Sequence, residues 1–400
     1  MDKPPLIRRV VIHNYKSIAQ CDVTLGRFNV FVGRNGAGKS NFLDALQFVA
    51  QALSPGSLSH ALESRGGMAN VLRRGMKTGD NFRIELQVQW SRSQADYVIQ
   101  IAKQPHGAFV VDEERLDYRT SEKGIPLFKR FIRNREKLSD SGDSDVDISS
   151  ISKESLYLPF ASIQYVVYGY VREALASLSI YNPIPSPMRR PHLIESGTTL
   201  KESGSNLTSV VSRLSRERPK TLARIIEYLA QIVPGLVTVQ PLEIGGYEIL
   251  EFRLQVPGES QPRTFQSQNM SDGTLRSLAV LVAALQFLES PDSSHVIGIE
   301  EPEAAIHPSA MAVLLDALRE ASVNTQILIT THSPDLVDGV DLDTDHLFAV
   351  SDTTGSTVIE PVDDASVMAI RTHLYSAGEL LRMDQLEPRS VHSIEEVAPK

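Results

Sequence analysis

Eight residues near the start of the chain have the types and spacing of a phosphate-binding loop. Residues 33–40 read Gly-Arg-Asn-Gly-Ala-Gly-Lys-Ser, which fits the pattern G-x-x-x-x-G-K-[ST]. The glycines allow a tight turn whose backbone N–H groups point inward and form a cradle for phosphate oxygens. In such a loop, Lys39 reaches the β- and γ-phosphates and the Ser40 hydroxyl ligates Mg²⁺. The pattern predicts a bound nucleoside triphosphate with Mg²⁺.

The flanking residues favour this interpretation over a chance match. Residues 28–32 are an apolar run typical of a buried strand, and apolar residues recur at helical spacing from about Lys39 onward. A strand, a glycine-rich turn and a helix in this order bring the positive end of the helix dipole to the phosphates. The predicted nucleotide-binding residues of this loop are Gly33, Asn35, Gly36, Gly38, Lys39, Ser40 and Asn41.

Two adjacent carboxylates follow a second apolar run far along the chain. Residues 295–303 read HVIGIEEPE, and Val296 to Ile299 are predicted to form a short buried strand. In P-loop enzymes the first acid after such a strand holds the Mg²⁺ shell, which assigns Glu300 to the metal. Glu301, one step later on the strand, is expected to face the other way and to orient the attacking water.

A histidine ends a third apolar run. In residues 325–336, TQILITTHSPDL, a predicted strand from Gln326 to Thr330 leads to His332. A histidine at a strand end beside this site can contact a γ-phosphate, although a histidine alone is more often structural. Together with the P-loop and the tandem glutamates, His332 is predicted to be functional.

Between these motifs, residues 269–288 read NMSDGTLRSLAVLVAALQFL. Ser271, Asp272 and Gly273 precede a predicted apolar helix, and one interpretation is a capped core helix. A Ser-x-Gly turn at a helix N-terminus is also an anion site, so the chain has two phosphate sites. If these lie on opposite edges of the domain, one nucleotide reaches both only when it is sandwiched between two protomers. The sequence therefore predicts a homodimer or larger oligomer.

The order of these motifs resembles the ABC-class ATPase heads, in the branch that contains RecF, the structural-maintenance-of-chromosomes heads and the OLD ATPases. More narrowly, the chain resembles the stand-alone bacterial ATPases of that branch. The matching segments are NYKSI (14–18), GRNGAGKSNFLDAL (33–46), ALESRGGMANVLRRG (61–75), MSDGTLR (270–276), IEEPEAAIHP (299–308) and TTHSPDL (330–336).

The resemblance implies ATP as the nucleotide and gives each motif a role. It implies Lys39 and Ser40 as the Walker A residues, Glu300 as the Walker B acid, Glu301 as the catalytic base, His332 as the switch histidine, and Ser271 with Gly273 as a signature that contacts ATP in trans. The signature reads SDGT rather than SGGQ, and the Walker B acid is Glu rather than Asp. Both departures favour this branch over transporters. Gln87, Gln89 and Gln164 are the candidates for the Q-loop glutamine, and none is assigned.

The predicted fold is α/β, a P-loop ABC-type ATPase head. Residues 1–118 are expected to form its β-rich N-terminal lobe with Walker A, and residues 119–245 an inserted, mainly helical lobe. Residues 246–365 are expected to return to the head with the signature, Walker B and the switch histidine. Residues 366–400 are expected to form a C-terminal helix and tail.

Composition restricts the setting and the partners. The 400 residues carry a net charge of −9, contain one cysteine and include no apolar run near the roughly 18 residues that span a bilayer. We expect a cytoplasmic protein with no membrane partner. The net negative charge also argues against a protein that coats nucleic acid non-specifically. Basic residues with aromatic neighbours in residues 127–137 and basic residues in residues 71–77 leave DNA as a possible partner, although an ordinary solvated surface explains them equally.

Three classes of function remain open. The preferred one is an ABC-class ATPase that acts on DNA or in anti-phage defence beside a separately encoded effector, with no nuclease domain expected in this chain. A protein-only, ATP-dependent regulatory switch is the alternative. A transporter motor is the least favoured, because Thr274 stands where a transporter signature has glutamine.

Overall fold

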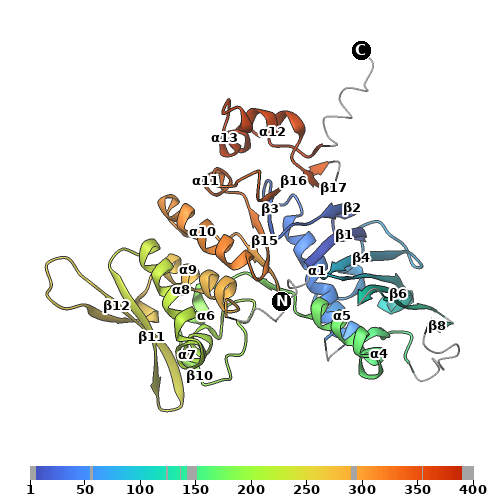
Figure 1. Ribbon diagram of the computed structural model, residues 1–400, viewed down its shortest axis with the longest axis horizontal. Helices are drawn as coiled ribbons and strands as arrows, with labels where there is room; N and C mark the ends of the chain where they lie inside the picture. The colour runs from blue at the N-terminus through green and yellow to red at the C-terminus, as the bar shows by residue number, and fades with distance from the viewer. Residues whose placement is uncertain are drawn as a thin grey trace.

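The structure, a computed structural model, contains three β-sheets in the residues that it describes, together with the helices that cover them (Figure 1). It describes residues 6–54, 57–122, 125–135, 137–141, 151–289, 295–353 and 355–389.

A six-stranded sheet forms the centre of the molecule. Its strand order is β17-β16-β3-β15-β14-β9, and all strands are parallel except the edge strand β17. The bounds are β3 Phe28–Val32, β9 Ser179–Tyr181, β14 Val296–Glu300, β15 Gln326–Thr331, β16 His346–Thr353 and β17 Ser356–Pro361. Helices or strands cover both faces, which explains why β3, β14 and β15 are almost entirely buried.

A seven-stranded antiparallel sheet lies beside this central sheet, with the order β2-β1-β4-β5-β6-β7-β8. Its strands are β1 Leu6–Tyr15, β2 Ile18–Thr24, β4 Asn81–Gln89, β5 Ser93–Lys103, β6 Phe109–Glu122, β7 Ile125–Asn134 and β8 Leu138–Asp140. Helix α1, Lys39–Ala52, packs between the two sheets and shares one apolar core with both (Figure 1). The P-loop helix is therefore packed against a sheet on each of two sides.

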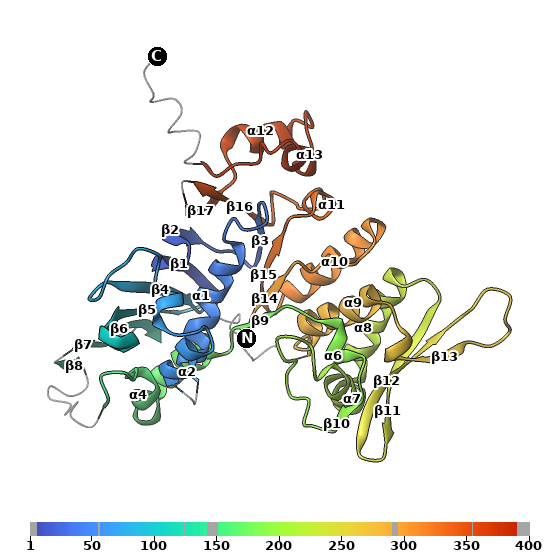
Figure 2. The ribbon, with the colours of Figure 1, turned by 180° about the vertical axis from the view of Figure 1, so that it is seen from behind.

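The other face of the central sheet carries a second core. It is covered by α7 Leu207–Glu217, α8 Pro219–Ile232, α9 Asp272–Leu285 and α10 Met311–Ser322 (Figure 2). Helix α9 is buried almost all round from Thr274 onward, in keeping with the apolar run that makes up most of its length. A third sheet packs on these helices and consists of β10 His192–Leu193, β11 Leu236–Ile244, β12 Tyr247–Leu254 and β13 Arg263–Gln266.

The shorter helices connect these layers. They are α2 Ser57–Glu63, α3 Met68–Val71, α4 Leu158–Gln164, α5 Val166–Ala176, α6 Pro185–Met188 and α11 Pro334–Val337. None of the helices within the described ranges is both long and apolar enough to cross a bilayer.

The predicted inserted lobe is not a separate unit, because several of its strands belong to the other two sheets. Residues 119–245 contain α4 to α8, but they also contain β7 and β8, which complete the seven-stranded sheet, and β9, which joins the central sheet. Strand β6 continues past residue 118 to Glu122, and the 245 boundary falls in the turn between the paired strands β11 and β12. The cause is long-range pairing, because β9 bonds to β14 more than a hundred residues later.

The single C-terminal helix predicted from residue 366 is also wrong. Two helices are present, α12 Asp364–Arg371 and α13 Ala377–Arg382. A capping box between Ser376 and Glu379 starts the second helix, and His373 has a positive φ of 56°, which breaks the first. Residues 390–400 of the predicted tail lie outside the described residues.

Candidate active site

The P-loop has the turn and the helix start that its sequence predicts. Gly36 and Gly38 have φ values of 81° and 104°, and α1 begins at Lys39. A Cβ at position 38 would lie 2.0 Å from the Thr357 hydroxyl, which donates a 2.9 Å hydrogen bond to the carbonyl of Ala37. Glycine is therefore required at position 38 both for the backbone angle and for the close approach of β17.

The Lys39 ammonium group is held by its own loop. Its Nζ donates to the carbonyls of Gly33 at 2.7 Å and Arg34 at 3.0 Å. Burial lowers the pKa of Lys39, and the carboxylates of Glu301, Glu303 and Glu300 oppose that change. The acids that follow β14 thus lie within electrostatic reach of the P-loop lysine, as the motif assignment requires.

Strand register brings the three motifs to one edge. In the parallel ladder, Glu300 pairs with Thr330 and Thr331 pairs with Val32, so the P-loop, the tandem glutamates and His332 all follow aligned strand ends. Ligand sites of open parallel sheets lie at this carboxyl edge. The structure therefore brings together the P-loop, Walker B and switch residues that the sequence separates by up to 300 positions.

A cavity of about 360 Å³ opens beside α1 and is lined by Ser40 and Glu300. Asn182, directly after β9, also lines it and donates through Nδ2 to Glu300 Oε2 at 3.0 Å. Hydroxyl and carboxylate oxygens are ligands that Mg²⁺ prefers, so Ser40 and Glu300 are suited to hold the metal of an ATP complex.

Asn182 is a site residue that sequence reasoning missed. Gln87, one of the Q-loop candidates, donates to Asp96 on the seven-stranded sheet, and Gln164 ends α4. The amide side chain that the structure places beside Glu300 is instead that of Asn182. The proline-rich sequence around it gave no signal of a polar site residue.

Glu301 and His332 form a carboxylate–imidazole pair at this edge. The Oε1 of Glu301 lies 3.2 Å from Nδ1 of His332, and both side chains are partly exposed, at 38% and 45%. The expectation that Glu301 lies on the strand and faces the other way is wrong. Glu301 follows the last residue of β14 and has a left-handed φ of 44°, while its backbone N–H still donates to the carbonyl of Thr330 at 2.9 Å.

A third carboxylate, Glu303, supports this loop. Its Oε1 accepts a 2.6 Å hydrogen bond from the Thr331 hydroxyl, and only 7% of the residue is exposed. Burial raises the pKa of Glu303, and the Thr331 hydrogen bond opposes that rise. This hydrogen bond joins the residue before His332 to the loop after Glu301. The backbone segments that carry Glu301 and His332 are therefore held together. The sequence signal that could have indicated Glu303 is its place as the third acid of the EEPE segment, residues 300–303.

The Ser271 turn caps α9 as predicted and remains exposed. Ser271 Oγ accepts from the backbone N–H of Thr274 at 3.1 Å, and both Ser271 and Asp272 are open to solvent. Gly273 has a neighbour that the sequence did not indicate, because a Cβ there would lie 2.3 Å from the carbonyl of Ala305. The turn thus contacts the loop that contains Glu301 in the same chain.

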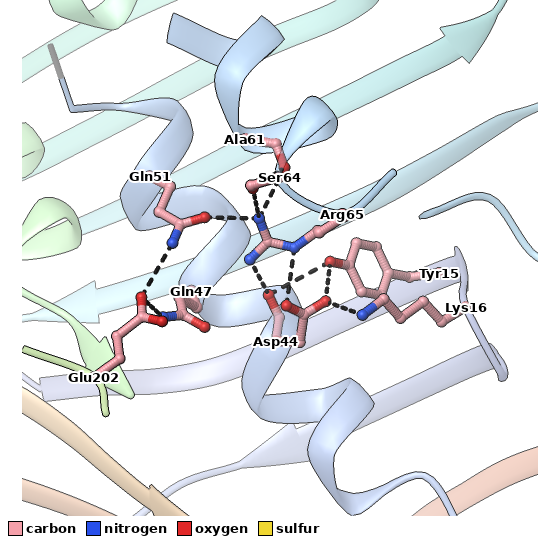
Figure 3. Close-up of polar contacts among 9 residues, drawn as sticks. All are labelled: Tyr15, Lys16, Asp44, Gln47, Gln51, Ala61, Ser64, Arg65 and Glu202. Atoms are coloured by element: carbon pink, nitrogen blue, oxygen red, sulfur yellow. Dashed lines mark hydrogen bonds and ion pairs between the residues drawn. The ribbon is translucent and has the colours of Figure 1, made fainter. Parts of the chain in front are cut away.

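Two weak sequence motifs converge on α1. Figure 3 shows Asp44, one turn after Ser40, accepting from Lys16 Nζ at 2.5 Å, the Tyr15 hydroxyl at 2.7 Å and Arg65 Nε at 2.9 Å. Lys16 comes from NYKSI and Arg65 from ALESRGG. The ion pairs fix α1 and place the Lys16 ammonium at the wall of the same cavity as Ser40.

The basic segment 127–137 is largely engaged within the protein. It forms most of β7 rather than a helix face, and Arg133 is buried against the carbonyls of Ser152 and Ser155. Arg130 pairs with Asp117, and Arg135 pairs with Asp112 at 2.6 Å. These contacts weaken the case for this segment as a DNA-binding surface.

Comparison with known proteins identifies the family of the chain. Residues 28–338 match the family described as "AAA domain, putative AbiEii toxin, Type IV TA system". The Old nuclease of Escherichia phage P2 is 23% identical over an alignment of 360 residues that covers 82% of this chain and 56% of that protein. The DNA replication and repair protein RecF of Porphyromonas gingivalis is 34% identical over 88 residues, 21% of this chain and 24% of that protein. The chain thus spans a little over half of one relative and a quarter of the other.

Two solved structures share the fold. A crystal structure of an Smc head bound to the C-terminal winged-helix domain of ScpA has a TM-score of 0.54 and 15% identity, and covers 91% of this chain and 99% of that one. An Smc head with an extended coiled coil, bound to the C-terminal domain of ScpA from Pyrococcus furiosus, has a TM-score of 0.51 and 14% identity, with 92% and 99% covered. The predicted ABC-type head fold is confirmed.

Proposed function

Because this chain belongs to the AAA-domain family that its residues 28–338 match, we propose that it binds and hydrolyses ATP by closing two heads around the nucleotide. The observation that carries the proposal is the Glu301–His332 pair, 3.2 Å apart. It lies at the sheet edge where the P-loop also follows the end of its strand, β3. A fold match alone would not support hydrolysis, because fold does not determine function.

The geometry supports a division of roles. The inward N–H groups of the P-loop and the Lys39 ammonium bind the phosphates, and Ser40 with Glu300 would hold Mg²⁺, which supplies charge neutralisation at the phosphates. Glu301 accepts a hydrogen bond from the attacking water and orients it towards the γ-phosphate. His332, whose Nδ1 lies 3.2 Å from that carboxylate, holds its orientation and donates to the γ-phosphate.

The second phosphate site supports the sandwich. Ser271 lies at the exposed N-terminus of the fourteen-residue helix α9, where the helix dipole favours an anion. We place the nucleotide of one head between its own P-loop and the Ser271 turn of the partner head. ATP then acts as the link between protomers, and hydrolysis releases them.

The test uses Glu301→Gln, which keeps the size and the polar contacts of the side chain but removes the charge that orients water. We expect hydrolysis to fall about 10³-fold, and the protein to sediment with ATP as a dimer that wild type forms only transiently. Glu227→Gln, an exposed glutamate on α8, is the matched control. A variant that hydrolyses ATP normally, or that sediments identically with and without ATP, would contradict the proposal.

We further propose that the ATPase works in a DNA-related process or in phage defence through a separate effector protein. Relatives named as a nuclease and as a replication and repair protein support the first part. The Smc heads solved in complex with ScpA support a partner that docks on the head. A conformational change is the output of such a head, so another protein has to read it.

A protein-only regulatory switch is the second candidate function. The internal pairing of Arg130, Arg133 and Arg135 favours it, because few cations of that segment are left for phosphates. Exposed Arg74 and Lys77 still favour DNA contact. Binding to DNA that weakens steeply with salt distinguishes the first function from the second.

A further inference from the structure

Arg276 joins α9 to the catalytic loop. It lies on the first turns of α9, five residues after Ser271, and only 9% of it is exposed. Its Nη2 donates to the backbone carbonyls of Glu300 and Glu301, both at 3.1 Å. Its Nη1 donates to the carbonyl of Pro183, and Nη2 also reaches Asn182 Oδ1 at 3.4 Å. One guanidinium group therefore binds the segment after β14 and the segment after β9.

The loop that Arg276 holds is conformationally unfavourable by itself. Glu301 and Ala305 are non-glycine residues with φ values of 44° and 64°, in the left-handed region that side chains disfavour. Such residues persist only where the surrounding structure fixes them. Arg276 contacts the loop at its start, and Gly273 contacts it at its end through the Ala305 carbonyl. Helix α9 thus grips the loop at both ends.

The character of this contact is specific to arginine. The guanidinium group is buried and its hydrogen bonds go to carbonyl and amide oxygens rather than to a carboxylate. A planar group with several fixed N–H donors can bind two segments at once, whereas a lysine ammonium is a point charge on a flexible stem. The bond therefore transmits the position of α9 to the backbone of Glu301.

We propose that Arg276 is a positioning residue that couples the Ser271 turn to Glu301 in the same head. The proposal rests on the proposed function. When the Ser271 turn of one head engages the nucleotide of its partner, α9 is fixed, and Arg276 fixes the loop that aligns Glu301 on the head's own nucleotide. Each nucleotide is then hydrolysed only when the other is also engaged. The two sites act as one unit, which is a coupling between distinct sites.

The first experiment replaces Arg276 with lysine. Arg276→Lys should bind ATP like wild type but lower the single-turnover rate about 10²-fold, because misplacing a reacting group by an ångström costs that much. In the Glu301→Gln background, the same substitution should cost little more, because Arg276 acts through Glu301. Arg218→Lys, which removes a comparable hydrogen bond to the carbonyl of Gln286 beyond the far end of α9, is the control and should leave the rate unchanged. An equal loss in both backgrounds would show a merely structural role.

The second experiment needs no Arg276 variant and so does not depend on its folding. Wild-type protein is mixed with Ser271→Arg protein, and sedimentation with ATP verifies that mixed dimers form. Without coupling, a mixed dimer keeps one working site, so activity falls in proportion to the wild-type fraction f. With coupling, only wild-type dimers work and activity falls as f², so an equal mixture retains about one quarter of the rate rather than about one half.

The outcomes separate the two proposals. If Ser271→Arg protein alone hydrolyses ATP normally, the signature assignment and the sandwich fail. If it is inactive alone but the equal mixture retains half of the rate, the sandwich stands and the coupling through Arg276 is overturned.

Discussion

The P-loop and the loop of residues 300–305 line the same site but are held in different ways. The P-loop takes its shape mainly from its own glycines, with one hydrogen bond from Thr357 of β17 to Ala37, and Lys39 is bound by carbonyls of the loop itself. The loop after β14 has left-handed Glu301 and Ala305, and side chains of other elements hold it. Arg276 of α9 binds its start, and Thr331 of β15 binds its third carboxylate.

This difference separates binding from turnover. A loop that forms its own shape binds phosphate whether or not the rest of the head moves. A loop that depends on α9 and β15 aligns its catalytic side chain only when those elements are in place. Nucleotide binding should therefore survive most changes around residues 300–305, whereas hydrolysis should not.

The largest effect is expected at the self-contained loop. Lys39→Ala removes the cation that contacts the phosphates, and should abolish ATP binding and lower hydrolysis at least about 10³-fold. Titration calorimetry measures the first loss and phosphate release the second. Lys129→Ala, a half-buried lysine that lies over the ring of Tyr165, is a control and should bind ATP normally. Retained ATP affinity in Lys39→Ala would break the assignment of binding to the P-loop.

A smaller effect, confined to turnover, is expected at the exposed helix cap. Ser271→Arg should leave ATP binding to the P-loop intact and reduce hydrolysis by at least about 10²-fold, because a large cation blocks the partner's nucleotide. Ser271→Thr keeps the cap to Thr274 and should retain most activity. Comparison of calorimetry with phosphate release reads the two properties separately. Normal turnover of the arginine variant would leave Ser271 as a helix cap only.

The smallest effect is expected at His332. His332→Ala removes a donor that supports the γ-phosphate and the Glu301 carboxylate, but leaves the carboxylate itself. Turnover should fall about tenfold to a hundredfold, less than in Glu301→Gln, with ATP affinity unchanged. Single-turnover rates of the two variants, measured side by side, test the order. A larger loss at His332 than at Glu301 would mean that the histidine, rather than the glutamate, positions the water.

Several features could be derived from the sequence because their chemistry is local. The P-loop needs only a strand, glycines at fixed offsets and a helix, and all of these lie within 25 residues, 28–52. The acids of β14 and the histidine after β15 also follow apolar strands directly. The cap of α9 at Ser271 is similarly a short-range pattern. Motifs of this kind carry their own structural context.

The lobe boundaries could not be derived, because they depend on which strands pair. Nothing within the three residues of β9 indicates that they join β14, and β7 reads as a charged segment until it pairs with β6. Sheet pairing depends on packing across long sequence separations rather than on local propensity.

The same reason limits what the sequence says about the site. The proposed phosphate-binding loop, metal-binding acid and catalytic pair follow from residue types next to predicted strands. The tertiary structure alone brings Asn182 to Glu300, and Lys16 and Arg65 to Asp44. It also gives Glu301 its left-handed backbone after the end of β14 and brings Arg276 to the Glu301 carbonyl. Each of these contacts joins segments that the chain keeps apart, and only the packing of α1 and α9 against the central sheet brings their side chains within hydrogen-bond distance.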